Sequence, residues 1–322
     1  MGDVILEVES LKVYYYTLKG VVHAVDNVSL SLKRGEVLGI AGESGCGKST
    51  LAYALLKLVP PPGRIVSGRI VIDGMDVTKM SEAEVRRKIR WRKISMIFQG
   101  AMNVLNPVYQ VWFQIAEPLM VHKHVPPEEA YKRAVELLNM VGLDESIAKR
   151  YPHELSGGQK QRVVIAMALV MNPDIVIADE PTTALDVVVQ AQILNLMKKL
   201  VRELKTSLIL ISHDLSVIAE LADKVAIMYA GKIVEYGTSD QVYTNPLHPY
   251  TQALLAAIPR LRAPRGKLVY IPGQPPDLRY PPPGCRFAPR CKYALNICKH
   301  EEPPVIEVER GHLVSCWLYA RR

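Results

Sequence analysis

One short segment has the residue types and the spacing of a phosphate-binding loop. Gly42 opens a stretch that follows the pattern G-x-x-x-x-G-K-[ST]. Its glycines let backbone N–H groups curl around phosphate oxygens without a clashing Cβ. Lys48 would set its ammonium against the β- and γ-phosphates, and Ser49 would give its hydroxyl to Mg²⁺. The segment predicts an ATP site. Its binding residues are Ser44, Gly45, Cys46, Gly47, Lys48, Ser49 and Thr50.

Polar side chains stand where three other apolar runs end. Asp179 and Glu180 follow the run 174–178. Asp179 is placed to hold Mg²⁺ through water, and Glu180 to polarise an attacking water or take its proton. His213 and Gln99 also follow apolar runs, and open α/β sheets bind ligands outside such strand ends. Alone, the acidic pair would be a solvated strand end and His213 a structural histidine. Beside a phosphate loop, they indicate a catalytic site.

A second glycine-containing loop, residues 155–159, lies over a hundred residues after the first. Ser156 is predicted to cap a helix that starts near Gln159. Gly157 and Gly158 leave backbone N–H groups open, so a second anion site is expected at this helix N-terminus. An ordinary capped helix is the alternative interpretation. One nucleotide site in one subunit cannot easily use both loops, which favours a site shared by two subunits.

Apolar periodicity indicates the elements that must position these groups. Strands are predicted at residues 4–8, 11–16, 28–32, 37–41, 94–98, 174–178, 207–212 and 225–229. Helices are predicted at residues 49–58, 81–92, 128–141, 159–171 and 190–204. Strands that alternate with helices predict an α/β fold with a parallel, doubly wound sheet. Residues 100–172 contain no convincing strand and are expected to form a mostly helical insertion.

Composition places the chain among soluble cytoplasmic proteins. Its 322 residues are 49% hydrophobic, with a mean hydropathy of +0.07. No uninterrupted apolar run reaches the roughly 20 residues of a membrane-spanning helix, and the N-terminus lacks the build of a signal peptide.

The C-terminal quarter differs from the rest. Residues 246–322 hold twelve Lys and Arg against five Asp and Glu, thirteen of the 23 prolines and four of the five cysteines. This shift marks a separate module. Within it, residues 259–284 contain eight prolines and are expected to be a linker or an irregular wrap.

Together these motifs resemble the ATP-binding subunits of ABC transporters over nearly the whole chain, which implies a P-loop NTPase core. Residues 155–159 match the signature loop of that family, which closes over ATP held by the P-loop of a second subunit. The resemblance implies that Asp186, at the end of the segment 184–186, belongs to the loop that bridges the two ATP sites. It implies that His213 contacts the γ-phosphate.

The same resemblance assigns two further residues. Gln99 would sense Mg²⁺ and the attacking water, and its loop would respond to the membrane subunits. Tyr15 would stack on adenine. The sequence departs from the family after Gln99, because Gly100 and Ala101 stand where bacterial relatives usually carry an acidic residue and proline. That departure leaves the contact with the membrane subunits open.

The C-terminal quarter resembles the extension of oligopeptide/dipeptide importer ATPases, through the segments 245–251, 271–276 and 284–291. That subfamily works as a pair of related ATPases beneath two membrane permease subunits, with an external substrate-binding protein. The expected domains are an ATPase core over residues 1–99 and 173–245, a helical subdomain over 100–172 and an importer-type module over 246–322.

The four cysteines of this module are Cys285, Cys291, Cys298 and Cys316. Their spacing lacks the Cys-x-x-Cys pairs of a zinc ribbon, and disulfides are not expected in a reducing cytoplasm. Four thiolates suit a 4Fe–4S cluster, and the importer ATPases hold one in this region. A basic module would offset the negative charge of such a cluster. Zn²⁺ and four unliganded, buried thiols are the alternatives.

The resemblance implies an ATP-hydrolysing subunit of an importer of dipeptides, oligopeptides or oligosaccharides, peripheral on the cytoplasmic face of the cell membrane. ATP and Mg²⁺ would join two ATPase subunits, a sister chain or a second copy, and hydrolysis would let them part. The rival interpretation is a non-transport ABC ATPase acting on nucleic acid or the ribosome, which the net charge of +8 would suit. The chain has neither the sustained heptads of DNA-repair relatives nor the two ATPase modules usual in ribosome-acting ones. No nucleic acid partner is therefore expected.

Overall fold

Contacts within the chain divide it into two units in the computed structural model, which describes residues 3–100, 103–183, 185–257 and 271–320. Unit 1 comprises residues 1–6, 32–37 and 71–210, and unit 2 comprises residues 7–31, 38–70 and 211–322. The expectations for Ala101, Ala184 and residues 259–270 lie outside the described residues. Across the ranges described, no helix combines the length and the apolar character needed to cross a membrane.

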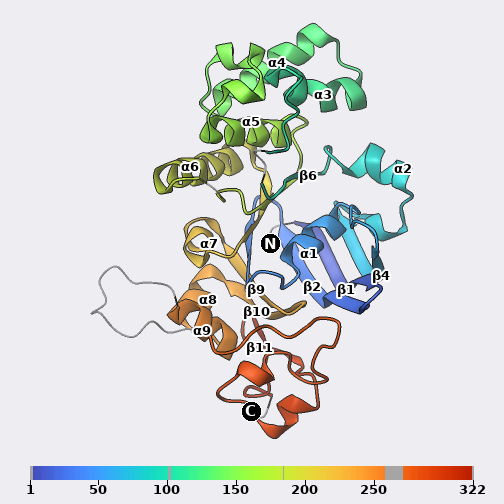
Figure 1. Ribbon diagram of the computed structural model, residues 1–322, viewed down its shortest axis with the longest axis vertical. Coiled ribbons are helices and arrows are strands. Elements are labelled where there is room, and N and C mark those ends of the chain that lie inside the picture. The colour runs from blue at the N-terminus through green and yellow to red at the C-terminus, as the bar shows by residue number, and fades with distance from the viewer. Residues whose placement is uncertain (1–2, 101–102, 184, 258–270, 321–322) are drawn as a thin grey trace. The chain divides into compact units, whose positions relative to one another are not determined.

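Parallel strands and helices make up unit 1. β6 pairs in parallel with β7, with Ile97 opposite Ala178, and α3, α4 and α5 pack against one another (Figure 1). The described part of residues 100–172 is helical without a strand, as predicted. The elements are β5 (Met75–Asp76), α2 (Glu82–Glu84), β6 (Ile94–Ile97), α3 (Val111–Lys123), α4 (Pro127–Met140), α5 (Gly157–Leu169), β7 (Ile175–Asp179), α6 (Val187–Leu204), most of β8 (Ser207–Ser212), and the short helices η1 (Val77–Lys79), η2 (Val85–Ile89), η4 (Glu145–Lys149) and η5 (Pro152–Glu154).

Four ion pairs among four side chains lie at the starts of β6 and β7. Lys93 Nζ lies 2.7 Å from Asp73 Oδ2 and 2.9 Å from Asp174 Oδ2. Arg34 bridges the same carboxylates, 2.8 Å from Asp73 and 2.9 Å from Asp174. The hydrogen bond from Lys93 lowers the pKa of Asp73. Because Lys93 precedes β6 and Asp174 precedes β7, the cluster joins the amino ends of the two strands.

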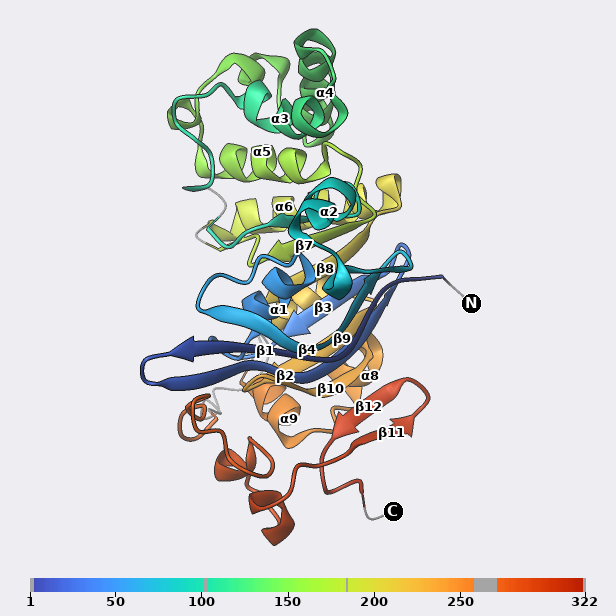
Figure 2. The same ribbon diagram turned by 90° about the vertical axis from the view of Figure 1, so that its right-hand side faces the viewer.

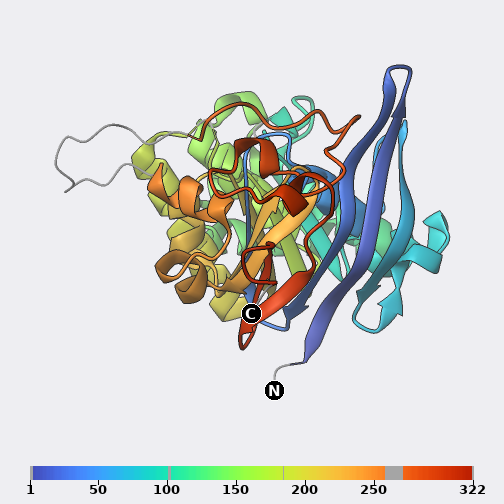
Figure 3. The same cartoon turned by 90° about the horizontal axis from the view of Figure 1, so that it is seen from below.

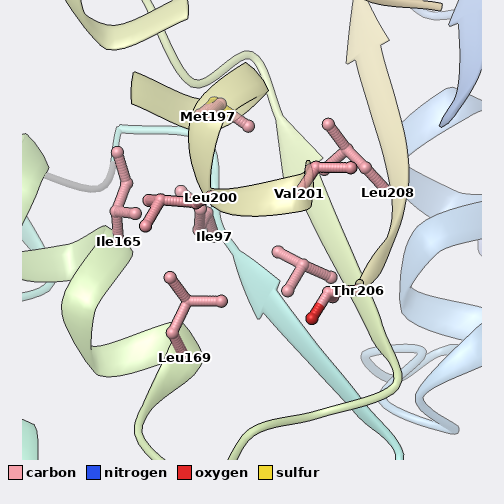
Figure 4. A pocket seen from close by; sticks show the side chains of 9 residues that line it. Ile97, Ile165, Leu169, Met197, Leu200, Val201, Thr206 and Leu208 are labelled. Carbon is pink, nitrogen blue, oxygen red and sulfur yellow. The ribbon is translucent and has the colours of Figure 1, made fainter. Parts of the chain in front are cut away.

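Apolar side chains of α5, α6, β6, β7 and β8 surround a small pocket in unit 1 (Figure 4). Its volume is about 20 Å³, which is room for about one water molecule. The one polar group in its lining, the Thr206 hydroxyl, donates to the Pro173 carbonyl at 3.2 Å. The pocket is therefore a packing defect and no ligand site.

Unit 2 combines a long hairpin with a mixed sheet. β1 and β2 run side by side (Figure 3) in the sheet order β2–β1–β4, and a second sheet has the order β11–β12–β10–β9–β3. The elements are β1 (Val4–Thr17), β2 (Gly20–Lys33), β3 (Val37–Ala41), α1 (Lys48–Leu55), β4 (Gly63–Ile72), α7 (Leu215–Leu221), β9 (Lys224–Tyr229), β10 (Lys232–Thr238), α8 (Ser239–Thr244), α9 (Pro249–Ala256), η6 (Ala288–Arg290), η7 (Asn296–Lys299), β11 (Val305–Glu309) and β12 (His312–Ser315).

The expected parallel sheet is confirmed for two strand pairs, and three strands that the sequence analysis did not predict follow β9. β3 pairs with β9 in parallel, but β10, β12 and β11 follow antiparallel. The reversal comes from the turn at Ala230 and Gly231, whose φ angles are 47° and 85°, since two positive φ values make a tight hairpin. The C-terminal module is likewise less irregular than expected, because the β11–β12 hairpin joins this sheet (Figure 2). The helix expected at 81–92 is correct only in part: α2 ends at Glu84 and a π-helical turn follows.

A buried carboxylate ties β10 to the C-terminal quarter. Glu235 is 1% exposed and accepts the N–H groups of Leu247 and His248, each at 2.8 Å. Its Oε1 also lies 2.8 Å from Nε2 of the fully buried His312 in β12. The Glu235 carboxylate thus accepts hydrogen bonds from the backbone that enters α9 and contacts a histidine of β12.

Replacing Glu235 by Ala should lower the stability of the protein by about 3–5 kcal/mol, because two buried N–H groups and a histidine lose their acceptor. Thermal or denaturant unfolding of the full chain measures the effect. Glu309→Ala, on an exposed position of β11, is the matched control and should change stability by less than about 0.5 kcal/mol. Equal stabilities of the two variants would contradict this role.

Candidate functional site

The phosphate loop follows β3 and has no room for side chains at two of its glycines. Gly42 and Gly47 have φ angles of 154° and 106°. A Cβ on Gly42 would lie 2.0 Å from the Met228 carbonyl oxygen, and one on Gly47 would lie 2.0 Å from that of Ala24. Backbone atoms cannot yield at such distances. The loop is therefore pressed against β9 and β2 in a shape that requires glycine.

The start of α1 and the side chain of Lys48 make this loop suited to anions. The N-cap residue of α1 is Gly47, which has no side chain that could accept a hydrogen bond from the helix. The first N–H groups of the helix therefore remain available. Lys48 is 7% exposed, and its Nζ donates to the carbonyls of Gly42 at 2.7 Å and Glu43 at 3.0 Å. Burial raises the pKa of the Cys46 thiol, so Cys46 contributes no charge. The loop is a preformed cradle with one internal cation.

Tyr15 lies beside this loop. Its hydroxyl is 3.5 Å from Oγ1 of Thr50 in the first turn of α1. Tyr14 instead donates to Asp26 at 2.8 Å, and Tyr16 is 41% exposed. Of the three consecutive tyrosines, Tyr15 is therefore the one in contact with the phosphate-loop helix.

In unit 1, the register of β6 and β7 brings three predicted residues to one edge. Ile97 lies opposite Ala178 in a parallel pair, and Gln99 and Glu180 each follow two residues after these positions. Asp179 is fully buried, whereas Gln99 is exposed. The amide and the two carboxyl groups thus share the carboxyl ends of adjacent strands.

The backbone of Glu180 has an unusual conformation. Its φ is 51°, in the left-handed region that costs a residue other than glycine about 1–3 kcal/mol. Thr183 supports this conformation: its N–H donates to the Glu180 carbonyl at 3.2 Å and its hydroxyl donates to Glu180 Oε2 at 3.3 Å. Such conformations concentrate at functional sites.

The predicted signature loop and Asp186 both lie at helix starts in unit 1. Ser156 caps α5 through a reciprocal pair, in which its hydroxyl accepts from the Gln159 N–H at 3.3 Å and its N–H donates to Gln159 Oε1 at 2.9 Å. The predicted cap is confirmed. Asp186 caps α6 and accepts from the Val189 N–H at 2.9 Å. A Cβ on Gly158 would lie 2.9 Å from Val189 Cγ1, so the two helix starts pack closely.

His213 is exposed and follows β8 directly. The next residue, Asp214, caps α7 by accepting from the Ser216 N–H at 2.8 Å. The predicted residues are thus divided between the units. Tyr15, the phosphate loop and His213 belong to unit 2, and Gln99, Asp179, Glu180, the signature loop and Asp186 belong to unit 1.

The four cysteines of the C-terminal quarter were predicted to hold a metal cluster. Within the part of the chain that the structure describes, no three His, Cys, Asp or Glu side chains are arranged to hold a metal ion. Burial raises the pKa of Cys285 and Cys316 to about 11, so both thiols are neutral near pH 7. Two of the four cysteines are joined through their backbones, because the Cys285 N–H donates to the Cys298 carbonyl at 2.8 Å. Among the described residues, the cysteines are therefore not arranged as the ligand set that the sequence analysis expected.

Sequence reasoning missed the partners of Glu43. Arg290 and Tyr250, from the C-terminal quarter, bind the carboxylate and the N–H of this loop residue. Glu43 occupies a variable position of the loop pattern. No local signal links it to Tyr250 or Arg290, which follow it by 207 and 247 positions.

Comparison with known protein families agrees with this geometry. The model of the ABC transporter family matches residues 25–183. The model of the oligopeptide/dipeptide transporter C-terminal region matches residues 234–298. The first match includes the phosphate loop, the signature loop and Glu180, and the second includes three of the four cysteines of the C-terminal quarter.

Curated relatives match along almost the whole chain. The oligopeptide transport ATP-binding protein OppD of Bacillus subtilis is 50% identical over 98% of this chain and 88% of its own length. Its counterpart in Escherichia coli is 47% identical over 98% and 94%. Among solved structures, the dimeric ATP-binding cassette MJ0796 in a post-hydrolysis state with ADP and Pi is 32% identical, with a TM-score of 0.64 over 73% of this chain and 98% of that one. The chain therefore belongs to the ABC transporter family, among the ATP-binding proteins of oligopeptide and dipeptide transport.

Proposed function

We propose that this chain hydrolyses ATP to power an ABC importer of oligopeptides or dipeptides. The observation that carries the proposal is end-to-end similarity to proteins named for oligopeptide and dipeptide transport. The C-terminal match adds to it, since this region belongs to a transporter subfamily. An ATPase acting on nucleic acid or the ribosome is not favoured, because the relatives that match this chain from end to end are named for oligopeptide and dipeptide transport.

The proposed roles follow from the strand ends and the loop. Lys48 leaves the loop carbonyls to bind the β- and γ-phosphates, and the open N–H groups of α1 bind phosphate oxygens. Ser49 and Asp179 hold Mg²⁺, with Gln99 beside them. Glu180 polarises the attacking water, and His213 contacts the γ-phosphate. Tyr15 stacks on adenine.

The second half of the ATP site comes from another subunit. Ser156, Gly157, Gly158 and Gln159 would close over ATP held by the P-loop of a second ATPase, either a sister chain or a copy of this one, and Asp186 would lie between the sites. Opening and closing of that pair would drive two membrane permease subunits. An external substrate-binding protein would deliver the substrate to the permeases. The chain would be peripheral on the cytoplasmic face of the membrane. Its proposed domains are the core (1–99, 173–245), the helical subdomain (100–172) and the module (246–322).

We further propose that Cys285, Cys291, Cys298 and Cys316 hold a 4Fe–4S cluster, with Zn²⁺ as the alternative. Burial raises the pKa of three of these thiols, and a backbone N–H hydrogen-bonded to each sulfur opposes that rise. The same N–H groups would stabilise the thiolates once iron is bound. Each donor lies two residues after its cysteine: Phe287, Tyr293 and Leu318. The cluster would supply a covalent staple for a module with few apolar runs.

Glu180→Gln should leave ATP binding intact and lower steady-state hydrolysis by about 10²–10⁴-fold, the usual contribution of a general base. It should also trap an ATP-bound dimer, detectable by gel filtration with ATP and Mg²⁺. Glu203→Gln, at the exposed end of α6, is the control and should hydrolyse ATP at the parental rate. Unchanged turnover in Glu180→Gln would remove this residue from the catalytic role.

Lys48→Ala should weaken ATP binding by roughly 10–100-fold, because a charged hydrogen bond to phosphate contributes about 1.5–3 kcal/mol. Equilibrium titration with a labelled ATP analogue measures the loss. Lys19→Ala, on the exposed turn between β1 and β2, should retain the parental affinity. A Lys48→Ala variant that binds as tightly as the parent would contradict the assignment.

The cluster is tested by the absorption spectrum and the iron and sulfide content of anaerobically purified protein. A broad band near ~400 nm, with about four iron and four sulfide per chain, is expected. Cys298→Ser should lose the iron, whereas Cys46→Ser should keep it. A colourless parent that binds one Zn²⁺, or no metal, would refute the cluster and leave the ATPase assignment untouched.

A further inference from the structure

Residues of the C-terminal quarter hold Glu43 of the phosphate loop by its backbone and by its side chain. The Glu43 carboxylate accepts from both terminal nitrogens of Arg290, Nη1 to Oε2 at 2.7 Å and Nη2 to Oε1 at 2.9 Å. The Glu43 N–H donates to the Tyr250 hydroxyl at 2.9 Å. Its carbonyl accepts from Lys48 Nζ at 3.0 Å. One loop residue therefore joins the P-loop lysine to two distant side chains.

The guanidinium of Arg290 is built into this position. Arg290 is 8% exposed, and its Nε donates to the Pro272 carbonyl at 2.8 Å. Its Nη1 also reaches the Tyr229 hydroxyl at 3.3 Å. Because these hydrogen bonds fix the planar guanidinium, its two terminal nitrogens face the Glu43 carboxylate in one orientation. Lysine could not reproduce that geometry.

The turn that carries Arg290 is bounded by two cysteines of the module. Arg290 ends η6, which begins at Ala288. The Ala288 N–H donates to the Cys285 carbonyl at 2.9 Å, and the Cys291 N–H donates to the Ala288 carbonyl at 3.3 Å. The fold of the cysteine segment therefore sets where the guanidinium lies.

We infer that Arg290 is a positioning residue for nucleotide binding, and that the C-terminal module fixes the phosphate loop through the Arg290–Glu43 pair. The inference rests on the proposed function, because it requires the loop to bind ATP. Without the pair, the Glu43 side chain would lose its anchor, the backbone of Glu43 would keep only its hydrogen bonds to Tyr250, Lys48 and Cys46, and the loop would populate other backbone conformations. ATP would then bind only the fraction of molecules in the competent shape, which lowers its apparent affinity.

Three variants of the full-length chain test the inference: Arg290→Gln, Glu43→Gln and the double variant. Affinity is measured by titration with a labelled, non-hydrolysable ATP analogue and Mg²⁺. Each single variant should bind roughly 3- to 30-fold more weakly, the range for coupling through one contact network. The double variant should bind no more weakly than either single variant, because Arg290 acts through Glu43. KM for ATP should rise by the same factor with kcat unchanged, since Glu180 is untouched.

Arg310→Gln, on an exposed turn of the same module, should keep the parental affinity. Parental affinity in Arg290→Gln would overturn the inference. So would a loss caused by Arg290→Gln that is undiminished on the Glu43→Gln background, because Arg290 would then act only by stabilising its module. If Arg290→Gln does not fold, Glu43→Gln alone tests the inference, and a Glu43→Gln variant with the parental affinity for ATP would refute the positioning role of Arg290. A parent chain that fails to bind the analogue would instead refute the proposed function.

Discussion

The shape of the phosphate loop depends on a steric constraint, the contact of two glycines with backbone carbonyls. Gly42 lies against Met228 and Gly47 lies against Ala24, with no space for a Cβ at either position. The loop therefore cannot relax outward without losing its packing on β9 and β2. Held in this way, it keeps the N–H groups of α1 open and folds the Lys48 ammonium onto its own carbonyls. The cation is thus already desolvated and oriented before a phosphate arrives, so binding exchanges one set of oxygens for another.

In unit 1, ion pairs lie at the amino ends of β6 and β7, and the predicted catalytic carboxyl groups lie at the opposite ends of these strands. Lys93 and Asp174, with Arg34 and Asp73, form closed ion pairs where β6 and β7 begin. At the other ends of the same strands, the chain turns directly into the acidic pair and Gln99. The ion pairs are partly exposed, so each adds little stability, but a network of four fixes register. Because register is shared along a strand pair, a clamp at one end sets the level of the functional groups at the other.

Local signals in the sequence were sufficient for some elements and not for others. β3 and β8 have the predicted bounds, because each is a short apolar run bounded by polar residues. The Ser156 cap was readable because the reciprocal Ser and Gln lie three residues apart. β4 was missed, since Gly63 and Gly68 interrupt its pattern. Pro118 inside α3 hides that helix in the same way.

The candidate site was predictable to the extent that its residues follow a local pattern. The loop, the acidic pair and the signature cap each occupy fewer than ten consecutive residues. The contacts of Glu43 depend instead on the antiparallel turn at Ala230 and Gly231 and on the irregular path of the C-terminal chain. Neither has a periodicity from which a contact 247 residues away could be deduced.

Two buried arginines change how the charge of the C-terminal quarter should be interpreted. Arg286 is 5% exposed and pairs with Asp26, and Arg290 pairs with Glu43. Both carboxylates precede residue 50, so part of the excess positive charge is neutralised inside unit 2 and is not presented to a nucleic acid. Burying such pairs costs desolvation energy and adds little net stability. They do impose geometry, because a misplaced module would leave a carboxylate and a guanidinium buried without partners. The basic composition of the module is therefore explained in part by the need to dock it in one orientation on the phosphate-loop side of unit 2.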